Sequence, residues 1–237
     1  MARPYGCRLA VNHRILALAE ALLEDEGFQI AGVEAWAKYG GASDYEQDLH
    51  RDYPGHTLLV PSSAPAYRQL EMFVYLADVP EEFGPAHIVS RRHTAEFPAV
   101  PDRFLRPGRK STSRFHDDSG SPTLYEAEIS AAGPAGTVVA FEIGTIHRAT
   151  TMTATRGARY TMHLNFRGAG VTWGQRRGWA YIAGRENWSK FVQRATPRQL
   201  QVFGFPLPGH PYWTAETLAG MALRYPDLDL TPWDQAR

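Results

Sequence analysis

The sequence predicts a mainly β protein with flanking helices, and three observations support this fold class. Short apolar or alternating runs recur between clusters of Gly, Pro and Asp, a spacing typical of a β-sandwich or barrel. One early stretch has the period of an amphipathic helix. The chain has 237 residues, 43% of them hydrophobic, which is enough apolar material for one sizeable core. We therefore expect a single domain over residues 1–237.

The first predicted element is a helix that begins after Asn12 and continues to about Glu26. Asn is a favoured N-cap residue, and Gly27 is a typical stop signal. The apolar residues that share one side of this helix are Ile15, Leu16, Leu18, Ala19, Leu22 and Leu23. We expect that side to pack on a sheet.

The predicted strands follow in chain order. They cover residues 28–39, 57–60, 70–79, 86–89, 124–129, 137–141 and 159–166. The last is the clearest, because its apolar and polar residues alternate strictly. One face carries Tyr160, Met162, Leu164 and Phe166, and the other carries Arg159, Thr161, His163 and Asn165.

Residues 98–122 are irregular and rich in Pro, Gly, Ser, Arg and Asp. A loop of this length in a compact domain is usually a functional lid or a disordered segment, and the sequence favours neither. Its basic residues could attract an anionic substrate. They are Arg103, Arg106, Arg109, Lys110 and Arg114.

Charge and cysteine content limit the classes of partner. The 25 basic and 25 acidic residues balance, so the chain lacks the basic footprint of a nucleic-acid-binding protein, and we expect a small-molecule substrate. It has no apolar run of membrane length, so we expect no membrane partner. The lone Cys7 rules out an internal disulfide framework and favours a reducing compartment, which predicts a cytoplasmic protein. The sequence leaves the oligomeric state open.

His50, Asp52 and the distant His147 form a candidate metal site. On an extended strand, residues at i and i+2 project from the same face, so His50 and Asp52 could reach one ion. Two His and one carboxylate leave three positions open on an octahedral ion, as non-haem Fe(II) oxygenases require for cosubstrate and O2. The alternative is a plain hydrogen bond between His50 and Asp52. His116-Asp117 is a weaker ligand pair, because adjacent strand residues point to opposite faces.

Arg159 follows His147 by twelve positions, with a polar turn at residues 150–157 between them. We expect a short hairpin that returns Arg159 to the metal. Its planar guanidinium can grip a carboxylate through two parallel hydrogen bonds, and that carboxylate could belong to 2-oxoglutarate. Arg156 lies in the turn and is the weaker candidate.

Four segments carry a family resemblance. They are residues 47–54, 73–93, 136–148 together with Arg159-Tyr160, and 204–214 together with 224–227. In their order and spacing they resemble the phytanoyl-CoA dioxygenase family of Fe(II)/2-oxoglutarate-dependent oxygenases, in its small bacterial branch, over most of residues 28–233. The resemblance implies a double-stranded β-helix, a cupin-like jelly roll with the metal in its mouth.

The same resemblance assigns roles by position. His50, Asp52 and His147 would be the catalytic iron ligands, and Arg159 would hold the distal carboxylate of 2-oxoglutarate. Gln47 and Thr150 would contact the cosubstrate, and Lys38 the substrate. Family members often place Ser or Thr two residues after the distal His, where this chain has Ala149 and then Thr150, and their Arg commonly follows that His by eleven residues. The loop here is one residue longer.

The implied function is oxidation, normally hydroxylation, of a small-molecule metabolite, often one of secondary metabolism. Fe(II), 2-oxoglutarate and O2 would be used, and succinate and CO2 released. Halogenating relatives have Gly or Ala where Asp52 stands, so halogenation is not expected. Two alternatives remain open: a cupin-like iron dioxygenase that does not use 2-oxoglutarate, and a non-catalytic jelly roll that binds a ligand. The sequence names neither the substrate nor the type of oxidation.

Overall fold

The structure is a computed structural model that describes residues 5–42, 46–57, 59–62, 64–95, 97–111, 116–117, 119, 122–171 and 186–234. Only the backbone is described for residues 5–7, which include Cys7, and Arg114 lies outside the described residues. The described helices are α1 (Tyr5–Ala10), α2 (His13–Leu23), α3 (Tyr53–His56), α4 (Pro122–Glu126), α6 (Glu186–Val192), α7 (Pro197–Gln201), α8 (Ala215–Arg224) and α9 (Thr231–Asp234). None of them is both long enough and apolar enough to cross a membrane.

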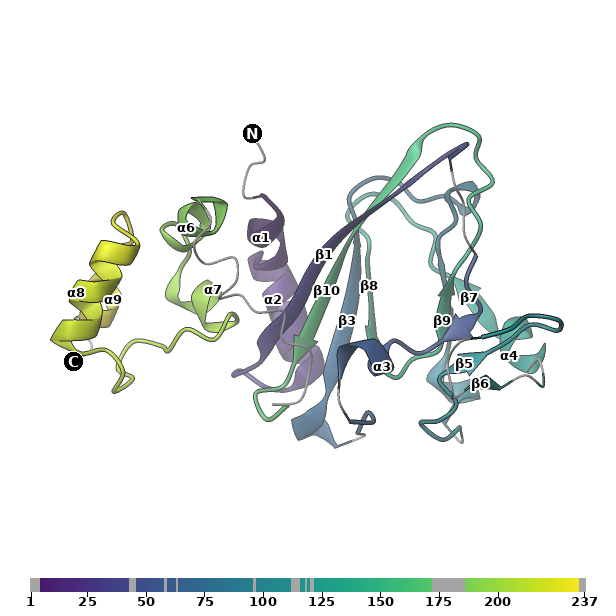
Figure 1. Cartoon of the computed structure of the whole chain (residues 1–237), viewed down its shortest axis with the longest axis horizontal. Coiled ribbons are helices and arrows are strands. Elements are labelled where there is room, and N and C mark those ends of the chain that lie inside the picture. Colours follow the sequence, from purple (N-terminus) through teal and green to yellow (C-terminus); the bar gives the residue numbers. More distant parts are fainter. Residues whose placement is uncertain are drawn as a thin grey trace.

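Two β-sheets form the body of the fold (Figure 1). The first has the order β1 (Gln29–Tyr39), β10 (Ala158–Arg167), β3 (Gln69–Tyr75) and β8 (Val138–Glu142). The second has the order β6 (His116–Asp117), β5 (Arg103–Phe104), β2 (Leu49–His50), β9 (His147–Ala149), β4 (Ala86–Val89) and β7 (Glu128–Ser130). Strands of both sheets line one cavity, so the sheets face each other. The predicted mainly β jelly roll with flanking helices is confirmed.

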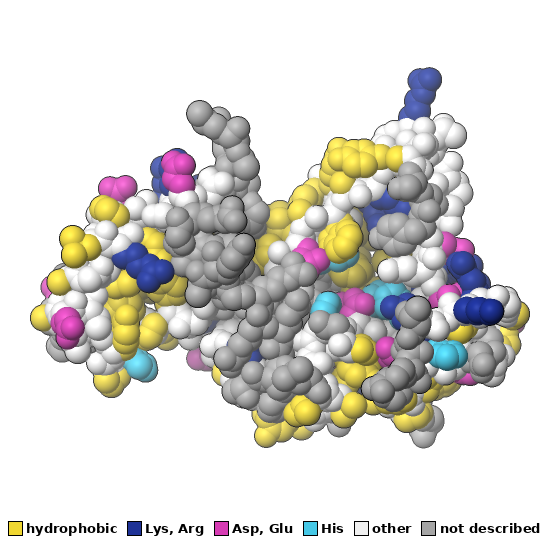
Figure 2. Space-filling model, viewed as in Figure 1, with side chains coloured by type: hydrophobic (Ala, Val, Ile, Leu, Met, Phe, Trp, Pro, Cys, Tyr) yellow, Lys and Arg dark blue, Asp and Glu magenta, His cyan; other side chains and the backbone are white. Residues whose placement is uncertain are grey.

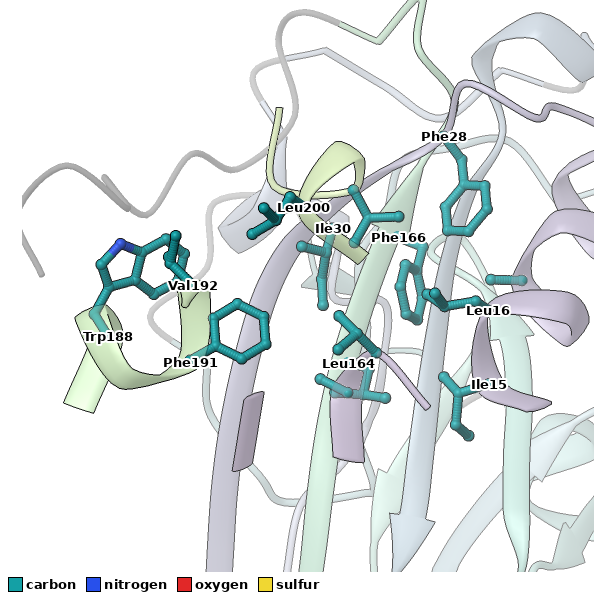
Figure 3. Packing of buried hydrophobic residues seen from close by; sticks show 14 of the residues in the cluster. Ile15, Leu16, Phe28, Ile30, Leu164, Phe166, Trp188, Phe191, Val192 and Leu200 are labelled. Carbon is teal, nitrogen blue, oxygen red and sulfur yellow. The ribbon is translucent and has the colours of Figure 1, made fainter. Parts of the chain in front are cut away.

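Helices cover the outer face of the four-stranded sheet. Helix α2 lies against it, and Asn12 caps the helix by accepting from the Arg14 backbone N–H at 3.0 Å. Figure 3 shows Ile15 and Leu16 of this helix beside Leu164 and Phe166 of β10, with Phe191 and Leu200 of the C-terminal helices close by. The main hydrophobic core therefore lies between this sheet and helices from both ends of the chain.

A β-bulge at Ala31 adjusts β1 to this core. The register pairs Ile30 with Phe166 and Gly32 with Asn165, so Ala31 has no partner on β10. Because side chains alternate with period two, the extra residue changes which positions face outward. Ile30 before the bulge and Val33 after it therefore both pack against the helices.

Three details of the sequence prediction are wrong. Of the predicted strand 57–60, the described residues Thr57, Leu59 and Val60 belong to no strand: α3 ends at His56, and Leu59 and Val60 are more than half exposed. Pro61 supplies no backbone N–H to a sheet there. Residues 124–129 divide between α4 and β7, since a short apolar run does not distinguish helix from strand. Leu22 is 41% exposed rather than buried with the core, because the helix buries a narrower stripe than its apolar residues suggest.

The irregular segment 98–122 contributes to the second sheet. β5 pairs with β2, so that Arg103 lies opposite His50 and Phe104 opposite Leu49. Phe104 and Leu105 are buried, and Phe104 belongs to a cluster with Leu49 and Ile146. Residues 112–115, 118, 120 and 121 of this segment are outside the description, and its role as a lid stays a prediction.

Candidate metal centre

His50 and His147 are cross-strand neighbours. β2 pairs with β9 at these two residues, and their imidazole ring centroids are 4.7 Å apart. Each Nδ1 lies within hydrogen-bond distance of a backbone carbonyl two residues earlier: 2.9 Å from Asp48 O for His50 and 3.0 Å from Thr145 O for His147. If each Nδ1 carries the proton, each Nε2 presents its lone pair to the cavity, the arrangement in which a metal-binding histidine is held by its other ring nitrogen.

Asp52 completes the triad, although not in the way the sequence predicted. β2 ends at His50, and Asp52 has helical backbone angles at the start of α3, so the two residues do not share one strand face. Pro54 in the first turn favours the helix at this point. The Asp52 carboxylate still reaches both imidazoles, with Oδ1 3.2 Å from His50 Nε2 and Oδ2 3.3 Å from His147 Nε2.

The charges of the triad reinforce one another. Burial alone would raise the pKa of Asp52, but the charge of His147 and the hydrogen bonds from both histidines outweigh it and hold that pKa well below its usual range. Burial would lower the pKa of His147, yet the nearby Asp52 carboxylate raises it to about 9. A proton and a metal ion compete for the same Nε2 atoms, so these residues attract a cation of either kind.

The triad opens into a cavity of about 890 Å³, open mouth included, between the two sheets. Figure 2 shows His, acidic and basic side chains gathered in the hollow on this side of the molecule. The inner face of the four-stranded sheet supplies Glu34, Trp36, Glu71, Phe73, Tyr75, Arg159, Thr161, His163 and Asn165. The face of β10 that the sequence predicted to be polar is thus the cavity wall.

Arg159 lies in this cavity but is not brought there by a hairpin. β9 and β10 belong to different sheets, so residues 150–157 cross from one sheet to the other, and the predicted hairpin is wrong. The Arg159 side chain is 9% exposed and donates a hydrogen bond to the Gly84 carbonyl. This bond holds the guanidinium head group at the cavity wall. Arg156 is exposed on the turn.

The structure places the other three predicted contacts at the same end of the fold. Gln47 lines the cavity, and its side-chain oxygen accepts from the Ala149 N–H at 3.1 Å. Lys38 is buried and donates to the Thr150 carbonyl at 2.8 Å. The Thr150 hydroxyl donates to the Pro85 carbonyl at 2.6 Å. Neither Lys38 nor Thr150 is among the residues that line the cavity, and their roles stay predictions.

The sequence analysis assigned no role to His56, Glu71 and Asn165, which also line the cavity. His56 Nδ1 lies 2.6 Å from Glu71 Oε1, and the Asn165 side-chain amide donates to the same oxygen at 3.1 Å. Glu71 is 1% exposed. Glu71 lies within the apolar run of β3. A carboxylate there indicates a buried polar site in the sequence, because a buried carboxylate needs hydrogen-bond partners.

Among the described residues, two groups of His, Cys, Asp and Glu have ligand atoms close enough to share an ion: His50, Asp52 and His147, and then Asp52, His56 and Glu71. The second shares Asp52 with the first, and a direct His56–Glu71 hydrogen bond occupies it. His116 and Asp117 belong to neither group. The first group is therefore the candidate metal centre.

No protein-family model matches the chain, and no curated protein matches it. Solved structures with the same fold include the epimerase SnoN, in complex with Fe3+, alpha ketoglutarate and nogalamycin RO, at 23% identity and a TM-score of 0.51, over 74% of this chain and 63% of that one. Another is EctD from S. alaskensis with 2-oxoglutarate and 5-hydroxyectoine, at 22% identity and a TM-score of 0.51, over 73% of this chain and 57% of that one. The matched region is therefore less than two thirds of either protein.

Proposed function

We propose that this protein is an Fe(II)- and 2-oxoglutarate-dependent dioxygenase that oxidises, and normally hydroxylates, a small-molecule metabolite. The observation that carries the proposal is the triad of His50, Asp52 and His147 on the wall of a cavity that also contains Arg159. SnoN and EctD, whose structures hold iron and the 2-oxo acid, support it by their fold. The likeness to the phytanoyl-CoA dioxygenase family rests on sequence motifs alone.

The donor set fits Fe(II). Two imidazole nitrogens and a carboxylate would leave positions of the ion open for other ligands, and all three residues line the cavity. The backbone carbonyls of Asp48 and Thr145 orient the two rings. Because these carbonyls lie one residue before β2 and two residues before β9, the strands that carry the two histidines also fix the carbonyls that orient them, and the site needs little rearrangement to receive an ion.

Each group of the chain then has a task. Fe(II) with 2-oxoglutarate would supply O2 activation coupled to decarboxylation, with release of succinate and CO2. Arg159 would hold the far carboxylate of the 2-oxo acid by charge-assisted hydrogen bonds, with Gln47 and Thr150 nearby. Phe73 and Phe141 pack around His147, with ring centroids 6.0 and 4.9 Å from its ring, and keep water from that side of the imidazole.

The experiment is a titration of Fe(II) and then 2-oxoglutarate under nitrogen, followed by succinate release on addition of O2. Wild type should bind one Fe(II) and then 2-oxoglutarate. His147→Ala should lose iron binding and reduce succinate release to background, whereas His13→Ala, at an exposed position on α2, should do neither. Unchanged iron stoichiometry in both His50→Ala and His147→Ala would refute the assignment.

The alternative without 2-oxoglutarate has one observation in its favour, namely that Arg159 already donates to the Gly84 carbonyl. In that case the arginine would serve only to hold the loop of Gly84. Oxygen consumption with turnover but without succinate would select this alternative.

A further inference from the structure

The second sheet holds the two histidines of the triad, but it does not hold Asp52. His50 lies on β2 and His147 on β9, and these two strands pair with each other. Asp52 stands outside both strands, at the start of the four-residue helix α3. The position of its carboxylate therefore depends on what holds α3.

Hydrogen bonds from both ends of α3 hold it. Near its start, the Tyr53 hydroxyl donates to the carbonyl of Ala99 at 3.0 Å, in the segment that leads to β5. At its end, His56 Nδ1 lies 2.6 Å from Oε1 of Glu71 on β3. Among the described hydrogen bonds, this second one ties α3 to the four-stranded sheet, and α3 lies beside β3 (Figure 1).

Glu71 is a rigid anchor for α3. Its side chain is buried on β3, an inner strand of the four-stranded sheet. Asn165 lies opposite it on β10, and the Asn165 side-chain amide donates to the same Oε1 at 3.1 Å. A side chain bonded to this carboxylate is therefore held in place with the sheet.

The His56–Glu71 pair also limits repulsion between two acidic groups. Ligand atoms of Asp52, His56 and Glu71 all lie within 4.8 Å of one another, so the two carboxylates are close. Burial, and after it the Asp52 charge, raises the pKa of Glu71 to about 7 against the hydrogen bond from His56. When the pair carries one proton it is neutral as a whole, and Glu71 then does not push the Asp52 carboxylate away.

We propose that His56 and Glu71 are positioning residues of the metal centre: the bond between them fixes α3 against the four-stranded sheet and keeps the Asp52 carboxylate beside the two imidazoles. Neither of the two needs to touch the ion. The inference rests on the proposed function only in taking the triad as the site of an ion. Removal of a residue that orients a metal ligand typically weakens metal binding tenfold to a hundredfold, so the effect is measurable without turnover.

The test measures the binding of Co(II) under nitrogen, because the visible absorption of this ion reports its ligands. Wild type should bind one Co(II). His56→Ala and Glu71→Ala should each raise the dissociation constant about tenfold to a hundredfold. The doubly substituted protein should bind no more weakly than the single variants, because all three lack the same bond. His13→Ala, at an exposed position, should bind as wild type does.

A conservative variant distinguishes positioning from a general loss of structure. His56→Asn places an amide N–H close to where the imidazole Nδ1 lies, so it can still bond Glu71 and should recover most of the affinity. At saturating Co(II), His56→Ala should show altered absorption because Asp52 is displaced, and His56→Asn should show the absorption of wild type. A variant that had only lost stability would keep the wild-type absorption once loaded.

The outcomes separate the two proposals. Wild-type affinity in His56→Ala, equal losses in His56→Ala and His56→Asn, or additive losses in the double variant would overturn the positioning role. If Glu71→Ala does not fold, the His56 variants decide the question, because the His56 side chain is 26% exposed at the end of α3. Failure of wild type to bind either Co(II) or Fe(II) would refute both proposals. The expected losses in a protein that binds the ion but never 2-oxoglutarate would leave the positioning role standing and refute the oxygenase.

Discussion

The two faces of the four-stranded sheet lie in different environments: the outer face packs on the helices, and the inner face lines the cavity. The outer face presents Leu70, Met72 and Val74 of β3 to the helices, and the inner face presents Glu71, Phe73 and Tyr75 of the same strand to the cavity. Neighbouring residues of one strand thus belong to different environments. The comparison teaches that stability and ligand chemistry can be changed separately here, one residue apart.

The largest effect on stability should come from the outer face. Leu164→Ala removes a side chain that is 0% exposed, and we expect the free energy of unfolding to fall by about 2–5 kcal/mol. Urea unfolding measures it, with Leu223→Ala, at an 85% exposed position, as the control. Iron binding by the folded fraction should be unchanged. If Leu164→Ala lost iron binding without a loss of stability, the outer face would not be separate from ligand binding.

Arg159→Ala tests the inner face of the same strand. We expect iron binding to persist and the Michaelis constant for 2-oxoglutarate to rise about tenfold to a hundredfold, as when a charge-assisted hydrogen bond worth about 1–3 kcal/mol is lost. Succinate formation at varied 2-oxoglutarate measures it. Arg156→Ala, on the exposed turn, is the control, and an effect there instead would show that the wrong arginine was chosen.

His163 should make stability depend on pH. Its pKa is lowered to about 3 in the folded protein, mainly by burial, against about 6.5 in the unfolded chain. Between these values the unfolded state binds a proton that the folded state does not, so stability falls as the pH falls below about 6.5. From pH 6.5 to 5 the loss should be at most about 2 kcal/mol. His163→Gln should show a shallower decline than wild type in urea unfolding at these two pH values, and an equal decline would contradict the prediction.

The smallest effect should come from Leu22. Because it is 41% exposed, Leu22→Gln should change the free energy of unfolding by less than about 0.5 kcal/mol. Leu23→Ala, at a position that is 2% exposed on the same helix, should lower it by about 2–5 kcal/mol. Similar values for the two variants would mean that α2 buries a wider face.

The predictable parts of the molecule were those that depend on local pattern. Strict alternation in residues 159–166 identified both β10 and its cavity-facing side chains, and Asn12 marked the start of α2. The triad was predicted from the His50-x-Asp52 spacing, the distant His147 and the flanking motifs of the family resemblance, and the structure brings all three residues together.

The parts that could not be predicted depend on tertiary context. Whether residues 150–157 return to the same sheet or cross to the other is decided by long-range pairing, which alternation does not encode. The helical backbone of Asp52 depends on how α3 begins. Glu34, His56 and Glu71 are far apart in sequence, so their meeting in one cavity required the strand register.

The bulge at Ala31 changes which residues of β1 face the helices. Before it, even-numbered residues such as Ile30 face the helices; after it, odd-numbered residues such as Val33 do. If Ala31 were deleted, the two halves of the strand could not both keep their apolar side chains on the helices. In one case Ile30 would face the cavity. In the other case Glu34 and Trp36 would face the hydrophobic core, and Val33 would face the cavity in their place. One residue without a partner on β10 thus lets both halves of β1 keep their apolar side chains on the helices.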